Sequence, residues 1–181
     1  MIESNIKSTT IIAVKKDNML AIGGDGQVTF GNYVIKNTAK KIRRMYRDSI
    51  LSGFAGSAAD GLALYERLEK KIEEYNGNLL KASVELAREW RTDKVLRRLE
   101  AMIIVGNKDN LLVISGNGDI LEPDDNIAVV GSGGPYAYAA AKALIKFTNL
   151  NALEIVKNSL EIASNICIYT NYNIITDFIQ W

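Results

Sequence analysis

The chain has 181 residues, of which 48% are hydrophobic and 24% charged, and its formal net charge is +1. This length is typical of one domain with a sizeable core, and the balanced charge gives no strong field that would favour nucleic acid or an anionic membrane. The sequence contains no histidine, which excludes Ser-His-Asp and Cys-His catalysis.

The N-terminal half predicts strands followed by a pair of helices. Runs rich in β-branched and other apolar residues, separated by turn signals such as Asp17-Asn18, predict strands that form hairpins. These strands are expected at Thr9–Lys16, Met19–Gly23, Val28–Ile35 (with an interruption at Gly31-Asn32), Lys41–Tyr46 and Ser49–Ala55. Apolar residues then recur at helical spacing, which predicts one helix from Ser57 to Asn76-Gly77 and another from Leu80 toward Arg98.

The C-terminal half repeats this order of strands and then helices. Strands are expected at Met102–Val105, Leu111–Ile114, Ile127–Val130 and, last in the chain, Asn173–Ile179. Pro135 fits the first turn of a helix, where its missing N–H costs little, and Asn151 is a capping residue for the next helix. Because strands and helices do not alternate regularly, the sequence favours an α+β fold of two mostly antiparallel sheets covered by helix pairs.

The first eight residues differ in character from the rest. Met1–Ser8 lack the apolar core of a signal peptide, and their polar, irregular sequence fits a short removable leader or a frayed terminus. The single cysteine, Cys167, cannot form an internal disulfide, which fits a reducing compartment. No apolar run approaches the length of a membrane span. We therefore expect a cytoplasmic protein.

Seven short blocks of sequence stand out along the chain. They are Thr9-Thr10-Ile11, Gly24-Asp25-Gly26-Gln27, Lys40-Lys41, Gly53-Phe54-Ala55-Gly56, Glu85-Leu86-Ala87-Arg88-Glu89-Trp90-Arg91, Gly131-Ser132-Gly133-Gly134 and Ile166-Cys167-Ile168-Tyr169-Thr170-Asn171. In this order and spacing they closely resemble the HslV family, whose members are peptidase subunits of a bacterial ATP-dependent protease and relatives of proteasomal β-subunits. The resemblance covers the chain from Thr9 to the final predicted strand.

The resemblance implies a four-layer αββα sandwich of the N-terminal nucleophile hydrolase type, with residues 1–8 as a propeptide and residues 9–181 as one peptidase domain. It implies a threonine endopeptidase that acts on unfolded proteins within an ATP-dependent complex. Members of the family form a double ring of two hexamers, which docks onto hexamers of the AAA+ ATPase HslU. This chain has no nucleotide-binding motif, so ATP is expected on the partner only.

Thr9 matches the nucleophile of the family. Cleavage before it would free an α-amino group to act as its base, so the resemblance implies autolytic cleavage between Ser8 and Thr9. Lys41 matches the active-site lysine, which favours the ionised hydroxyl and keeps the amine unprotonated, and Asp25 matches its counter-ion. From the residues alone, Thr9 could simply begin a strand and Ser8 could be the nucleophile. Lys41 lies in a basic stretch, in which only the spacing separates it from Lys40.

Gly56 and Ser132 match two supporting positions. The N–H of Gly56, just before a predicted helix, would bind the oxyanion of the tetrahedral intermediate, and Ser132 would help to orient the threonine amine. Gly56 also suits an ordinary strand-to-helix turn. The loop Gly131–Gly134 lacks the following Lys-Ser/Thr of a P-loop, so it is weak evidence for phosphate binding.

Ser164, Cys167 and Thr170 match positions whose backbone carbonyls bind a sodium ion in the family. Carbonyl oxygens at the end of a helix suit a hard cation. Members of the family often have glycine where this chain has Ser164, and backbone ligation tolerates that change if the conformation is kept. The alternative is an ordinary helix C-terminus whose carbonyls face water.

Three other functions fit parts of this pattern. A non-catalytic ring subunit would keep the fold as a scaffold, but it would not need the full set of catalytic matches. A small-amide hydrolase of the same broad fold would lack the lysine and the Trp90-Arg91 pattern. A binding module would use the glycine-rich loop for phosphates. The joint pattern favours the threonine peptidase.

Overall fold

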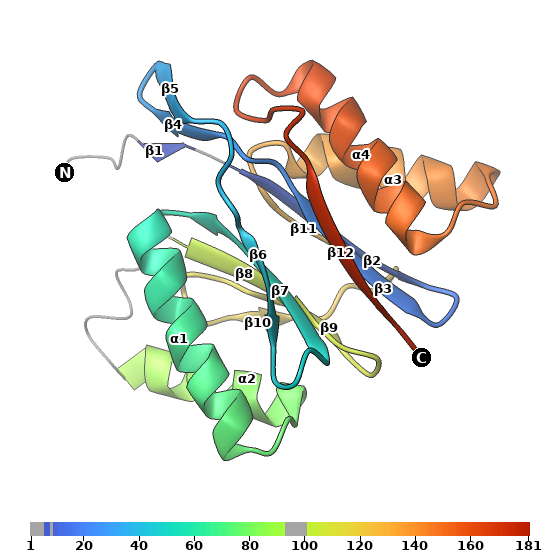
Figure 1. Cartoon of the computed structure of the whole chain (residues 1–181). Coiled ribbons are helices and arrows are strands. Elements are labelled where there is room, and N and C mark those ends of the chain that lie inside the picture. Colours follow the sequence, from blue (N-terminus) through green and yellow to red (C-terminus); the bar gives the residue numbers. More distant parts are fainter. Residues whose placement is uncertain (1–5, 8, 93–100) are drawn as a thin grey trace.

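Two antiparallel sheets lie face to face in the computed structural model, which describes residues 6–7, 9–92 and 101–181 (Figure 1). The first sheet contains β2 (Thr10–Lys16), β3 (Met19–Gly24), β11 (Ile127–Gly131) and β12 (Ile175–Gln180), in the order β11-β2-β3-β12. The second contains β6 (Ile42–Met45), β7 (Ile50–Gly56), β8 (Ala101–Gly106), β9 (Leu111–Ile114) and β10 (Ile120–Leu121), in the order β10-β9-β8-β7-β6. A small third sheet pairs β1 (Ile6–Lys7), β4 (Val28–Phe30) and β5 (Tyr33–Lys36).

A pair of helices covers the outer face of each main sheet. The helices α1 (Ala58–Glu74) and α2 (Leu79–Thr92) lie against the second sheet, and α3 (Gly134–Phe147) and α4 (Ala152–Ile166) lie against the first (Figure 1). The predicted α+β fold and its four-layer αββα order are thus confirmed. Within the described residues, no helix combines the length and the apolar character needed to cross a bilayer.

The centre of strand β2, from Ile11 to Val14, is apolar, and both of its faces are buried there. Ile11 and Ala13 point into the cluster between the two sheets. Ile12 and Val14 point the other way, into the cluster with α3 and α4. Alternate residues of a strand face opposite sides, so the continuous apolar run that predicted this strand reflects a central position in the sandwich.

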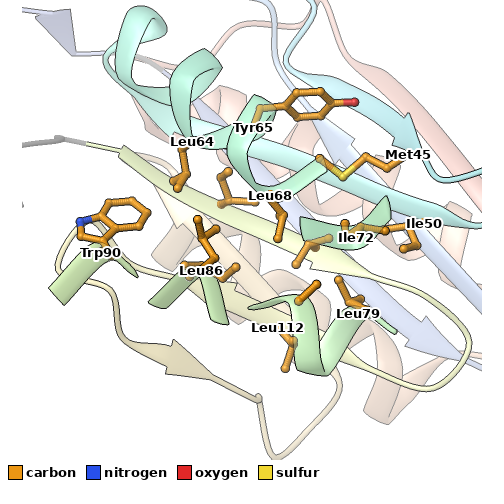
Figure 2. Packing of buried hydrophobic residues seen from close by; sticks show 14 of the residues in the cluster. Met45, Ile50, Leu64, Tyr65, Leu68, Ile72, Leu79, Leu86, Trp90 and Leu112 are labelled. Carbon is orange, nitrogen blue, oxygen red and sulfur yellow. The ribbon is translucent and has the colours of Figure 1, made fainter. Parts of the chain in front are cut away.

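The α1–α2 layer buries a separate apolar cluster against the second sheet (Figure 2). Leu64, Leu68 and Ile72 follow one another at four-residue spacing on one face of α1, and each is fully buried. Leu86 and Trp90 repeat that spacing on α2. The helical periodicity of the sequence predicts both helices and part of each buried face, but Leu62 and Leu80, which fit the same spacing, are exposed.

Capping interactions begin the helices where the sequence predicts. Asn151 accepts a hydrogen bond from the Glu154 backbone N–H at 3.0 Å, and the Glu154 side chain accepts one from the Asn151 N–H at 2.9 Å, which completes a capping box. Ser57 accepts from the Asp60 N–H at 3.5 Å at the start of α1. Pro135 occupies the first turn of α3, as expected.

The structure differs from the predicted elements in three places. The run expected over Val28–Ile35, with an interruption at Gly31-Asn32, forms two separate strands, β4 and β5, which pair with each other across a turn. The two-residue strand β10 is too short to give a sequence pattern, and it was not predicted. Strand β1 lies inside the segment expected as a leader, and it pairs with β4. The predicted extension of the second helix toward Arg98 lies outside the described residues.

Candidate active site

Buried polar side chains gather at the end of the sandwich where β2 begins and β3 ends. Those side chains are Thr9, Thr10, Asp25, Gln27, Thr29, Lys41 and Thr170. Buried polar groups need hydrogen-bond partners, so such a cluster implies a defined network. A cavity of about 550 Å³ opens elsewhere, where Arg44, Phe178 and Trp181 are among its lining residues, and it touches none of this cluster.

Asp25 follows β3 and accepts hydrogen bonds from three backbone N–H groups. They come from Thr10 at 2.8 Å, Gln27 at 2.9 Å and Asn171 at 3.3 Å. The side chain of Asp25 is completely buried. Hydrogen bonds from N–H groups stabilise the charged form of a carboxylate, so a buried anion is held beside the start of β2.

Lys41 is the buried cation that pairs with Asp25. Its Nζ lies 3.5 Å from Asp25 Oδ1 and donates a hydrogen bond to the Gln27 carbonyl at 2.5 Å. Burial lowers the pKa of Lys41 from its ordinary 10.5 to about 8, although the charge and hydrogen bond of Asp25 act in the opposite direction. The neighbouring Lys40 is exposed. The structure therefore distinguishes the two lysines by burial, whereas in the sequence only their spacing from the other blocks distinguishes them.

Thr9 is held by the loop that follows β11. The backbone N–H of Ser132 donates to the Thr9 carbonyl at 2.9 Å. Gly131 has a φ of +91°, and a Cβ atom there would overlap the Thr9 carbonyl, so this position requires glycine. The side chain of Thr9 is buried. Its φ of +94° is rare for a β-branched residue and indicates backbone strain.

Gly56 ends β7 close to the same junction. A Cβ atom at Gly131 would lie 3.3 Å from that of Ala55, the residue before Gly56. The helix α1 begins two residues later, behind the Ser57 cap. Gly56 thus lies between the Thr9 loop and a helix N-terminus, where N–H groups favour negative charge.

The residues matched to a cation site lie at the end of α4. Cys167 caps the helix, and its carbonyl accepts from the Thr170 N–H at 3.1 Å. The Thr170 hydroxyl lies 2.7 Å from the Thr10 hydroxyl. The Ser164 hydroxyl lies 2.8 Å from the Leu160 carbonyl. The side chain of Ser132, by contrast, is exposed, and only its backbone contacts Thr9 in the interactions described above.

Three residues of the network had no role in the sequence-based prediction. Thr10 joins Asp25 to Thr170 through its N–H and hydroxyl, and Gln27 supplies the carbonyl that binds Lys41. Asn171 donates to Asp25. All three lie inside the blocks that carry the family resemblance, but three of the four contacts named here use their backbone atoms, and residue type alone does not reveal such contacts.

This arrangement can support a nucleophile and its developing charge. Thr9 lies immediately before β2, Thr10 binds a buried carboxylate through its N–H, and that carboxylate pairs with a buried lysine. A group whose pKa is displaced by burial and a specific partner is typical of functional sites. The site has no histidine, so a base for the threonine must come from elsewhere.

The chain is similar to known proteins over most of its length. A family model described as proteasome subunit matches residues 6–179. The chain is 63% identical to the ATP-dependent protease subunit HslV of Aquifex aeolicus, covering 92% of this chain and 94% of that protein. It is 57% identical to the HslV of Pseudothermotoga lettingae, covering 93% and 96%.

A solved structure of eukaryotic HslV from Trypanosoma brucei superposes with a TM-score of 0.90 at 42% identity, covering 95% of this chain and 99% of that one. Both the sequence and the order of the four layers are therefore shared over nearly the whole chain. The chain belongs to the proteasome family of N-terminal nucleophile hydrolases, within the group of HslV protease subunits.

Proposed function

We propose that this chain is the threonine endopeptidase subunit of an ATP-dependent protein-degrading complex, with Thr9 as the nucleophile. The observation that carries the proposal is the buried Lys41–Asp25 pair, which is bonded to the backbone of Thr10, the residue after Thr9. A scaffold subunit gains nothing from a desolvated lysine at this place, because burying that charge costs free energy.

In the proposed reaction, the Thr9 hydroxyl attacks the carbonyl carbon of a substrate peptide bond. The free α-amine of Thr9 takes the hydroxyl proton and passes it to the leaving amine, so that an ester to Thr9 remains. Water then attacks the ester, and the amine again accepts and returns the proton. An α-amine has a reference pKa of about 8, so a usable neutral fraction exists near neutral pH.

Three further groups would assist this reaction. The Lys41 ammonium favours the ionised hydroxyl of Thr9 and, by repulsion, the neutral form of its amine. Asp25 holds Lys41 in place. The Gly56 N–H would bind the oxyanion, and Ser132 would orient Thr9 through the hydrogen bond to its carbonyl.

The reaction requires removal of residues 1–8, because Thr9 has an amide nitrogen instead of an amine while they remain. We propose autolytic cleavage between Ser8 and Thr9. The positive φ of Thr9 supports this, since strain of about 1–3 kcal/mol at such a residue would favour opening of the bond before it. Within the leader, Ile6 and Lys7 pair with β4 and are therefore extended.

The assembly proposed for this chain is a double ring of two hexamers that docks onto an HslU-type AAA+ ATPase hexamer. The HslV relatives are named as ATP-dependent protease subunits, which supports such a partner. Enclosure would keep folded proteins away from a peptidase with little sequence preference. ATP would bind the partner, which would unfold protein substrates and feed them to the site in the cytoplasm.

We also propose a sodium ion at the end of α4, held by the backbone carbonyls of Ser164, Cys167 and Thr170. The donor set fits, because a helix C-terminus presents carbonyls and partial negative charge to a hard cation. The Cys167 carbonyl already accepts from Thr170, but a carbonyl has a second lone pair. When bound, the ion would neutralise this end of α4.

Intact mass of the protein purified with its ATPase tests the nucleophile. The wild-type protein should begin at Thr9 and hydrolyse peptides, whereas Thr9→Ala should retain all eight leader residues and be inactive. Ser8→Ala is the matched control, and it should mature to the same mass as the wild type. Normal maturation of Thr9→Ala would refute self-processing, and an uncleaved but assembled wild-type ring would favour the scaffold.

A further inference from the structure

Asn171 lies just after the proposed cation segment, and its side chain joins two parts of the site. Its Oδ1 accepts from the Gly26 N–H at 3.2 Å, in the turn that carries Asp25. Its Nδ2 donates to the carbonyl of Asn37 at 3.1 Å and to the Asn37 side chain at 3.2 Å. Asn37 begins the short segment that leads to Lys41.

The backbone of Asn171 adds two more contacts. Its N–H donates to Asp25 Oδ2 at 3.3 Å, and its carbonyl accepts from the Ser164 hydroxyl at 2.9 Å. Ser164 belongs to α4, whose apolar face is buried against the first sheet. Asn171 is thus anchored to a rigid helix on one side and bonded to the catalytic carboxylate on the other.

The two segments that Asn171 joins need such support because neither is part of a strand. Residues 25–27 and 37–41 lie between strands, so no sheet ladder sets their positions. The two segments are in direct contact. A Cβ atom at Gly26 would overlap the Asn37 carbonyl, and the Ala39 N–H donates to the Gly26 carbonyl at 2.9 Å. Asp25 lies on one segment and Lys41 on the other, so their separation depends on how the segments are held together.

We propose that Asn171 is a positioning residue that sets the distance between Asp25 and Lys41. The inference rests on the proposed function, in which Lys41 supports the Thr9 nucleophile. Asn171 acts through the two segments, because its described hydrogen bonds reach Asp25, Gly26 and Asn37. It is expected to affect the chemical step and not the binding of substrate.

Asn171→Ala should lower kcat by roughly 10- to 100-fold, the range expected when catalytic groups are misplaced by about an ångström, with little change in KM. The pH profile gives a second readout. The charge of Asp25 raises the pKa of Lys41 against the effect of burial, so a looser pair should move the alkaline limb of kcat/KM to lower pH. A loss of folded protein alone would leave that limb in place.

Asn173→Ala is the matched control. Asn173 is an asparagine in the same segment, and its side chain donates to the same Asn37 carbonyl at 2.8 Å. Its side chain makes no described contact with Asp25 or Gly26, so this variant should keep kcat/KM within about twofold of the wild type. If Asn173→Ala lost as much activity as Asn171→Ala, the specific role of Asn171 would be overturned.

Asn171→Asp keeps the test decisive if the alanine variant does not assemble. The new side chain can still accept from the Gly26 N–H, but it cannot donate to Asn37. Its kcat should also fall. If the wild type is active and both Asn171 variants keep its kcat, the positioning role of Asn171 is contradicted but the proposed function is not. If the correctly matured wild type is itself inactive, the proposed function is contradicted.

Discussion

The α1–α2 layer and the Thr9 end of the sandwich are held together by different kinds of contact. In the layer, apolar side chains such as Leu68, Leu86 and Trp90 share one buried cluster in which each touches several others (Figure 2). At the Thr9 end, an ion pair joins Asp25 to Lys41, and a hydrogen bond joins Asp25 to Asn171. Apolar contacts are non-directional and many, whereas each polar contact is directional and has no substitute.

This difference implies that the two regions fail in different ways. Removing a methyl or methylene group from the cluster costs free energy of unfolding but leaves the site in place. Removing one polar group at the Thr9 end leaves most of the fold in place and removes the geometry that the reaction needs. Substitutions in each region can therefore be chosen to break this comparison.

The largest effect is expected for Lys41→Met. The variant keeps a side chain of similar length but loses the cation, so kcat/KM should fall by about 10²- to 10⁴-fold, the range typical for loss of a group that assists proton transfer. Peptide hydrolysis, normalised to the folded fraction from circular dichroism, measures this loss.

Lys40→Met is the control for that experiment, since Lys40 is the exposed neighbour. It should leave hydrolysis unchanged. If Lys40→Met and Lys41→Met lost the same peptide hydrolysis, positive charge anywhere in this stretch would be what the reaction needs, and the buried pair of Lys41 with Asp25 would have no specific role.

The next effect in size is expected for Leu68→Ala in α1. Leu68 is fully buried at the centre of the cluster, so its truncation should lower the free energy of unfolding by about 2–5 kcal/mol. Activity per folded molecule should remain, because the hydrogen bonds described for Asp25, Lys41 and Asn171 involve no residue of α1. Urea unfolding and peptide hydrolysis together measure both quantities.

Leu62→Ala provides the comparison on the same helix. Leu62 is 39% exposed, and its truncation should change the free energy of unfolding by only about 0.5 kcal/mol. A loss of catalytic activity per folded molecule in Leu68→Ala would contradict the separation between the two regions.

Much of the fold could be predicted from sequence because its elements have strong local patterns. The helical spacing of Tyr65, Leu68 and Ile72 and the capping box at Asn151 depend on neighbouring residues only. The strand β10 could not be predicted, since its two residues are too few to show a periodicity and it forms only through its pairing with β9.

The site, too, could be predicted from the sequence only in part. The sequence identifies Thr9, Asp25 and Lys41 through the family resemblance, and the structure places the last two in one buried pair. Alternation along a strand could not select Lys41, because β6 begins only at Ile42. Its burial comes from the packing of its segment on the turn after β3, and Asn171 contributes to that packing from the other end of the chain.

The smallest effect is expected from pH, because deprotonation of Lys41 should lower activity while its contribution to stability rises. Burial lowers the pKa of Lys41 to about 8, so kcat/KM should fall above pH 8, by roughly tenfold for each further pH unit.

In the unfolded chain Lys41 keeps its ordinary pKa of 10.5 and still binds a proton between pH 8 and 10. The unfolded state then binds more protons than the folded state, and the contribution of Lys41 to stability rises with pH, by up to about 1.4 kcal/mol per unit. Comparing urea unfolding of the wild type and Lys41→Met at several pH values isolates this contribution from that of other lysines. An alkaline limb near pH 10.5, with no pH-dependent difference between the two proteins, would mean that Lys41 is solvated in solution and that the Thr9 end is held in another way.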